Sequence, residues 1–301
     1  MQHRGAIVPA ESAVTRVMKR QVTNAVDAGD GDVRLRSLRQ QLAINQGDVA
    51  VRMQLAGEYR AKGYPELALE HYRFAAERQP SDGVQIEIAK TLRSMGLRAQ
   101  ALPELRGDSA VIESWRGILL DEMGEPVRAE AHHRAAVAKD PGSDSLHNNL
   151  GYNLLLQRRS AEAAAEFRRV LEIAPQSPLA RNNLALALAA DPAQALEQWR
   201  AAGDPAAAHN NVAALYIQRG QYGAARRELE SALAYKKDHP EAIRNLQLVG
   251  ELEGGSVHLP GRNPSKWKRF GVGFRNVVLG IEPPRTAAPS SAQQAASAGQ
   301  P

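Results

Sequence analysis

The sequence contains no cysteine, and only 5% of its 301 residues are aromatic. Without cysteine the chain can form no disulfide framework, thiolate metal site, cysteine nucleophile or cysteine-anchored lipid. Strands favour aromatic and β-branched side chains, so the shortage of aromatics, together with abundant alanine, argues against an all-β fold. The composition predicts an all-α protein built from closely packed helices.

Long apolar runs are also absent. No stretch of about 18 apolar residues is present to span a bilayer, and the first residues, MQHRG, do not start a basic-then-apolar leader. We therefore expect a cytoplasmic protein, with membrane association through its basic end as an alternative. An envelope location would need a leader ahead of this start.

The positive charge is concentrated at the end of the chain. The formal net charge is +5 at pH 7, and residues 254–301 hold six basic side chains and one acidic one. The remaining residues, 1–253, are therefore neutral overall. Because a protein that reads phosphate backbone needs basic groups spread along its binding face, nucleic acid is disfavoured as a partner.

The strongest signal is an internal repeat. Several stretches share one spacing, in which a large apolar residue and a small one are followed by an alanine, a large side chain and usually a proline. This pattern resembles the tetratricopeptide repeat over residues 15–252. Two stretches with identical spacing are Leu55-Ala56, Ala68, Tyr72, Pro80 and Leu150-Gly151, Ala163, Phe167, Pro175, and recognisable units cover 49–82, 110–143, 144–177, 178–205 and 206–239.

The resemblance implies a solenoid of about seven helix-turn-helix units that stack into a right-handed superhelix, after an N-terminal segment at 1–14. No unit can bury its apolar face alone, and small residues let paired helices approach to about 8–10 Å. The first and third units are degenerate, and Pro103 is expected to interrupt the second helix of the third because proline lacks the N–H donor. The first unit (15–48) has Met18, Val22, Ala25, Leu38, Leu42 and Ile44 at helical spacing, the third covers 83–109, and a polar-faced helix at 240–252 closes the stack.

No catalytic constellation emerges from the sequence. Gly271-Val272-Gly273 lacks the third glycine of a phosphate loop, so no cofactor is expected. His132 and His133 point about 100° apart on a helix, and His133 fills an apolar slot, which favours one packed and one solvated histidine over a metal site. We interpret the chain as non-enzymatic, with charge pairs on a solvated helix face around Glu162, Glu166 and Glu172.

Three successive first helices each carry two adjacent asparagines, which recur after 34 and then 28 residues because the unit at 178–205 is shortened. In some superhelical members of the family, the asparagine before the apolar–small pair lines the concave groove and hydrogen-bonds the main chain of a bound peptide. The resemblance implies this ladder for Asn149, Asn183 and Asn211, and an amide offers the required donor and acceptor. In the alternative interpretation these side chains bond a neighbouring helix.

The expected groove carries no charge, whereas family members that clamp a C-terminal carboxylate need Lys or Arg there. A neutral, extended polypeptide is therefore the predicted ligand. The candidate binding residues are Asn148, Asn149, Tyr152, Asn182, Asn183, Asn210 and Asn211, and the further positions expected to face inward are Ser145, Leu155, Leu179, Leu186, Ala189, Ala214 and Ile217.

The C-terminal part is a separate element. If 265–281 is helical, three large anchors fall on one stripe and three basic residues lie off it, which is a basic amphipathic pattern. The surface on which this segment docks could be a partner protein, an anionic membrane or the solenoid itself. The segment at 253–282 is thus a predicted docking element, with anchors Trp267, Phe270 and Phe274 and flanking charges Lys268, Arg269 and Arg275, and 283–301 is too poor in apolar residues to fold.

These observations predict a protein–protein interaction scaffold or adaptor. The rival function is a peripheral membrane or nucleic-acid binder that acts through the basic end. Residues 144–252 are also similar to the tetratricopeptide proteins that accompany bacterial tight-adherence pilus assembly, and this similarity implies a bacterial secretion or pilus-type setting.

Overall fold

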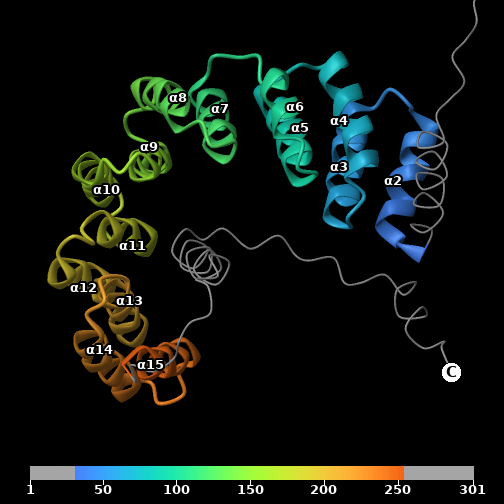
Figure 1. Cartoon of the computed structure of the whole chain (residues 1–301). Coiled ribbons are helices and arrows are strands. Elements are labelled where there is room, and N and C mark those ends of the chain that lie inside the picture. Colours follow the sequence, from blue (N-terminus) through green and yellow to red (C-terminus); the bar gives the residue numbers. More distant parts are fainter. Residues whose placement is uncertain (1–30, 254–301) are drawn as a thin grey trace, which may run out of the picture. The chain divides into compact units, whose positions relative to one another are not determined.

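The computed structural model describes residues 31–253, and every regular element in that range is a helix (Figure 1). The chain divides into two compact units, Met1–Pro141 and Gly142–Pro301. The N-terminal segment 1–14, the expected first helix of the 15–48 unit, and the C-terminal elements from 254 onward lie outside the described residues.

Each unit is a stack of antiparallel helix pairs. The first contains α2 (Val33–Ile44), α3 (Val49–Ala61), α4 (Pro65–Arg78), α5 (Asp82–Ser94), α6 (Arg98–Ala101), the 3-10 helix η2 (Leu102–Glu104), α7 (Ala110–Glu122) and α8 (Pro126–Lys139). The second contains α9 (Asp144–Leu156), α10 (Ser160–Ile173), α11 (Pro178–Ala187), α12 (Pro192–Ala201), α13 (Pro205–Gln218), α14 (Tyr222–Tyr235) and α15 (Pro240–Glu253). The helices begin where the sequence repeats are expected to begin.

Local sequence signals set the helix starts. The Asp48 carboxylate accepts a hydrogen bond from the Val51 N–H at 3.0 Å. Other first helices are capped in the same way by Ser81, Ser109, Ser177 and Asp204, and Asp32 caps α2 likewise. Such caps satisfy N–H groups that have no partner within the helix. The second helices α4 and α8 instead start with proline, whose missing donor costs nothing there.

The turn between paired helices contains a left-handed residue in five described pairs, although not between α11 and α12. Glycine, which has no Cβ to clash, supplies it in four units, and Arg158 takes the same place in the fifth with a φ of 62°. The glycines are Gly63, Gly96, Gly124 and Gly220.

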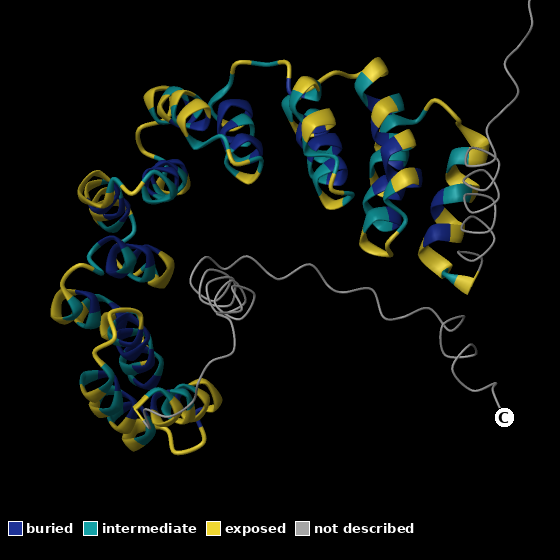
Figure 2. Ribbon diagram, in the orientation of Figure 1, coloured by how far each residue is buried: buried dark blue, intermediate teal, exposed yellow. Residues whose placement is uncertain are grey.

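Packing within each pair follows the small–large rule of the repeat. Ala56, Gly151 and Ala185 face the large side chains of their second helices, and the corresponding residues are buried. Figure 2 shows the buried positions gathered along the faces where paired helices meet. The predicted close approach through small residues is confirmed, and Phe167 and Trp199 are among the largest fully buried side chains.

The third repeat, residues 83–109, has the short second helix that the sequence predicts. Its second helix, α6, has four residues and gives way to η2, which contains Pro103. Ring closure at proline removes the donor that would continue the helix.

Two apolar expectations need correction. Ile44, at the last position of α2, is 88% exposed. Ala214 and Ile217, expected to face a groove, are buried. For Ile217 the reason is that it packs in a cluster with Ala242 and Val249 of α15.

Candidate functional site

Asparagine side chains join neighbouring first helices of the second unit. The Asn183 amide donates to Asn148 Oδ1 at 2.8 Å, which links α11 to α9. The Asn245 amide donates to Asn210 Oδ1 at 2.9 Å, which links α15 to α13. In both cases the first asparagine of one helix accepts from the asparagine that precedes the apolar residue of the next first helix. We call this contact an asparagine bridge.

The bridges change the expected ladder. Asn183 is 1% exposed and Asn210 is 8% exposed, so both lie beneath the surface rather than in an open groove. Their amides are held by a neighbouring helix, which is the alternative interpretation of the repeated pair. Asn149 and Asn211 are partly exposed, and their peptide-binding role stays a prediction.

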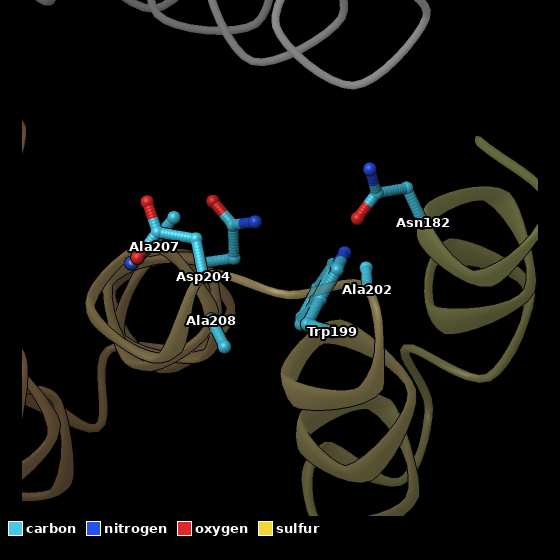
Figure 3. A pocket seen from close by; sticks show the side chains of 7 residues that line it. Asn182, Trp199, Ala202, Asp204, Ala207 and Ala208 are labelled. Atoms are coloured by element: carbon cyan, nitrogen blue, oxygen red, sulfur yellow. Dashed lines mark hydrogen bonds between the residues drawn. The ribbon is translucent and has the colours of Figure 1, made fainter. Parts of the chain in front are cut away.

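One asparagine bridge is missing. The repeat places Asn182 and Asn211 as the next pair, yet neither side chain makes a hydrogen bond within residues 31–253. Asn182 lies on α11, the first helix of the shortened repeat, in which α11 and α12 have 10 residues each. A pocket of about 120 Å³ opens at this place, lined by Asn182, Trp199, Ala202, Asp204, Ala207, Ala208 and Asn211 (Figure 3).

Trp199 forms one wall of this pocket. Its side chain is 2% exposed and packs in a cluster with Ala185 and Val212. The indole Nε1 is buried and has no hydrogen-bond partner among the described residues. Figure 3 shows this nitrogen at the edge of the ring toward which the Asn182 side chain is turned. A buried donor without a partner is costly, so the pocket is a polar site whose bonding is incomplete.

The second unit therefore presents an uncharged polar face. We call it the asparagine face and define it by the partly exposed side chains Asn148, Asn149, Tyr152, Asn182 and Asn211. All five are Asn or Tyr residues, so none carries a formal charge near neutral pH. The face offers amide donors and acceptors without a cationic clamp.

The comparisons with known proteins agree with this architecture. Residues 144–177 match the tetratricopeptide repeat family. Residues 144–177 thus match one tetratricopeptide repeat, and the described helices have the fold of tetratricopeptide solenoids. A search of curated proteins found no match.

Solved tetratricopeptide repeat structures share the fold at low sequence identity. PilW, described as a widely conserved type IV pilus biogenesis factor, is 21% identical with a TM-score of 0.54, covering 67% of this chain and 97% of PilW. A tetratricopeptide repeat protein from Parabacteroides merdae is 15% identical with a TM-score of 0.53, covering 78% and 98%. The APC/C hetero-tetramer Cut9-Hcn1 matches at 15% identity and a TM-score of 0.52, covering 80% of this chain but 49% of the other. This chain thus spans about half the length of that relative.

Histidine–glutamate pairs join the two helices of a repeat, α9 to α10 and α13 to α14. His147 Nδ1 lies 2.7 Å from Glu166 Oε2, and His209 Nδ1 lies 2.7 Å from Glu228 Oε2. Each pair joins a first helix to the second helix of its own repeat. The sequence interpretation assigned Glu166 to a solvated face and missed this contact, although the shared separation of 19 residues is a readable signal.

The adjacent histidines of the fourth unit are separated as expected. His133 is 1% exposed and lies 2.8 Å from Asp121 Oδ2. His132 is not simply solvated, because its Nδ1 lies 2.6 Å from Glu113 Oε2. Within residues 31–253, no group of three or more His, Asp or Glu side chains is placed to hold a metal ion.

The predicted docking element cannot be placed beside this face. Its anchors Trp267, Phe270 and Phe274 and its charges Lys268, Arg269 and Arg275 lie outside the described residues. In the part of the chain that the structure describes, no helix is long and apolar enough to cross a membrane.

Proposed function

We propose that the protein is a non-enzymatic scaffold that binds a neutral, extended polypeptide segment along the asparagine face. The observation that carries the proposal is the row of partly exposed amides on α9, α11 and α13; the pocket between Asn182 and Asn211 is lined by one charged side chain, the Asp204 carboxylate, and by no Lys or Arg. A peptide unit presents one donor and one acceptor, and a carboxamide side chain presents the same two groups.

The helix spacing suits an extended ligand. First helices of neighbouring repeats lie on the order of 10 Å apart, which corresponds to about three residues of extended chain at ~3.3 Å each. One amide per repeat can therefore meet every third peptide unit. Without Lys or Arg on this face, a free carboxylate terminus gains no charge-assisted bond.

The proposed setting is a bacterial secretion or pilus-type assembly. This setting is supported by the similarity of residues 144–252 to the tetratricopeptide proteins that accompany tight-adherence pili. A scaffold there would hold an unfolded or extended segment of another component. The basic end of the chain would add a membrane or partner contact.

Site-specific photo-crosslinking tests the proposed surface. Benzoylphenylalanine at Tyr152 replaces an aromatic on the asparagine face, and the matched control places it at Arg168, which is exposed on α10. In the full chain in its native host, we expect protein adducts from position 152 and none from position 168.

A second pair of full-chain variants separates the rival function. W267A/F270A removes two anchors of the predicted docking element and leaves the asparagine face intact. Adducts at 152 that survive W267A/F270A support the scaffold. Loss of all protein adducts, with lipid or nucleic acid still retained by the unchanged chain, would instead establish the rival.

A further inference from the structure

The pocket beside Trp199 lies where an asparagine bridge is interrupted. On either side of it the bridges Asn148–Asn183 and Asn210–Asn245 are closed, with amide contacts of 2.8 and 2.9 Å. Between them, Asn182 and Asn211 both line the pocket, and their side chains make no hydrogen bond within residues 31–253. The shortened repeat has thus left a gap between an acceptor and a donor that elsewhere meet.

The groups around this gap specify the chemistry of an occupant. In the closed bridges the first asparagine accepts through Oδ1 and the second donates through Nδ2. By the same arrangement, Asn182 offers an acceptor and Asn211 a donor. The buried Trp199 Nε1 adds a second donor without a partner. The Asn182 side chain is turned toward this nitrogen (Figure 3), and because it makes no hydrogen bond with the described residues, it can rotate to admit a ligand.

The volume limits the size of that ligand. A cavity of about 150 Å³ accepts benzene, which has six heavy atoms. The pocket here is about 120 Å³, which fits a group of about four or five heavy atoms. A single side chain enters it, and a folded loop or an aromatic ring does not.

We propose that the pocket receives one carboxamide side chain, that of asparagine or glutamine, from the bound polypeptide. Its carbonyl oxygen accepts from Asn211 and from Trp199 Nε1, and its amide N–H donates to Asn182 Oδ1. The inserted side chain then completes the interrupted row of bridges. This inference rests on the proposed function and names the residue type that the scaffold selects.

Competing occupants fit the pocket less well. The Asp204 carboxylate lines it, so an aspartate or glutamate side chain would meet a like charge. An apolar side chain would leave the Trp199 N–H and both amides without partners, which penalises binding. A carboxamide supplies an acceptor for the two donors and a donor for the remaining acceptor.

Propionamide, which has about five heavy atoms, tests the pocket directly. In the full chain, the indole N–H resonance of Trp199 is assigned by its loss in W199F and followed by NMR during titration. We expect a saturable shift in the millimolar range, because so small a ligand binds weakly. Propionate, matched in size but anionic, should leave the resonance unshifted at the same concentrations.

Variants locate the binding. Ala207→Leu fills the pocket and should abolish the propionamide shift, whereas the matched control Ala193→Leu, at an exposed position of α12, should not change it. Asn211→Ala should weaken binding about fivefold, the factor that one neutral hydrogen bond of about 1 kcal/mol gives. No shift with propionamide, an equal shift with propionate, or a shift that persists unchanged in both Ala207→Leu and Asn211→Ala would overturn the carboxamide site.

The two experiments distinguish a failure of the carboxamide site from a failure of the proposed function. Adducts at Tyr152 together with no propionamide binding would remove this inference and keep the scaffold. Propionamide binding without any protein adduct would remove the polypeptide as the source of the carboxamide.

Discussion

Gly151 on α9 packs against the ring of Phe167 on α10 with no room for a methyl group. A Cβ built at Gly151 would lie 2.7 Å from Phe167 Cε1 and 2.9 Å from Cζ. The ring is fully buried and cannot swing into solvent. Gly117 stands in the same relationship to His133, with a Cβ distance of 2.5 Å to the imidazole. The small position of the repeat is therefore a steric requirement in these two units.

Gly151→Ala should lower the free energy of unfolding by about 1–3 kcal/mol, because overpacking forces the helix pair apart. Urea denaturation followed by circular dichroism measures the change. The matched control is Gly57→Ala on α3, where the nearest heavy atom to a new Cβ is Tyr72 Oη at 3.8 Å. The control should raise stability by about 0.5–1 kcal/mol through the better helix propensity of alanine. Equal effects of the two variants would refute the steric argument.

The asparagine bridge between α9 and α11 predicts that two amides at the same position of the repeat motif, Asn183 and Asn211, differ in their contribution to stability. Asn183→Ala removes a buried donor bonded to Asn148 and should cost about 1–2 kcal/mol of unfolding free energy. Asn211→Ala removes an amide with no hydrogen bond within the described part of the chain and should change stability by no more than about 0.5 kcal/mol. Thermal denaturation of the two full-chain variants compares them, and a cost at Asn211 as large as at Asn183 would count against the interrupted row.

Arg158 offers a stabilising substitution. Its φ of 62° lies in the left-handed region, which costs a residue with a Cβ roughly 1–2 kcal/mol. Arg158→Gly removes that strain, but glycine also raises the entropy of the unfolded chain, which offsets part of the stabilisation. We therefore expect the free energy of unfolding to rise by about 0.5–1 kcal/mol. The reciprocal change, Gly124→Arg at a φ of 81°, should destabilise. Denaturant midpoints of both variants test the pair, and a fall in stability for Arg158→Gly would contradict it.

The repeat pattern predicted much of this fold because each slot has a simple physical requirement. Apolar–small spacing gave the helix pairs, and Pro103 gave the broken helix of the third unit. The site was less predictable. The sequence cannot distinguish an amide that faces solvent from one that bonds the next helix, so Asn183 and Asn210 were placed on the surface and are buried.

The Trp199 pocket has a different origin. It arises from the missing residues of the shortened repeat, which change the relation between helices rather than the identity of any side chain. Asn182 and Asn211 are the same residue type as their bridged counterparts, and only coordinates reveal that their bridge is open. The short length of the repeat at 178–205 was the sequence feature that could have indicated a change in helix packing there.

The titration of His71 makes the free energy of unfolding depend on pH. Its ring stacks on Tyr59, with centroids 5.7 Å apart and planes 6° from parallel, and its Nδ1 lies 3.2 Å from Arg52 Nη1. Burial, followed by the positive charge of Arg52, lowers the pKa of His71 from its usual 6.5 to about 4. Between these two values the folded state keeps the imidazole neutral while the unfolded chain binds a proton. The free energy of unfolding should therefore fall as the pH drops from about 6.5 to about 4.

His71→Phe isolates this effect, because it keeps an aromatic ring against Tyr59 and removes the titration. The unfolding free energies of the two proteins should change differently between pH 7 and pH 5, with the unchanged chain losing at most about 1 kcal/mol more after allowance for partial solvent screening. Other ionisable groups titrate alike in both proteins and cancel in the difference. Urea unfolding at the two pH values measures it, and parallel pH dependence in the two proteins would show that His71 does not carry the effect.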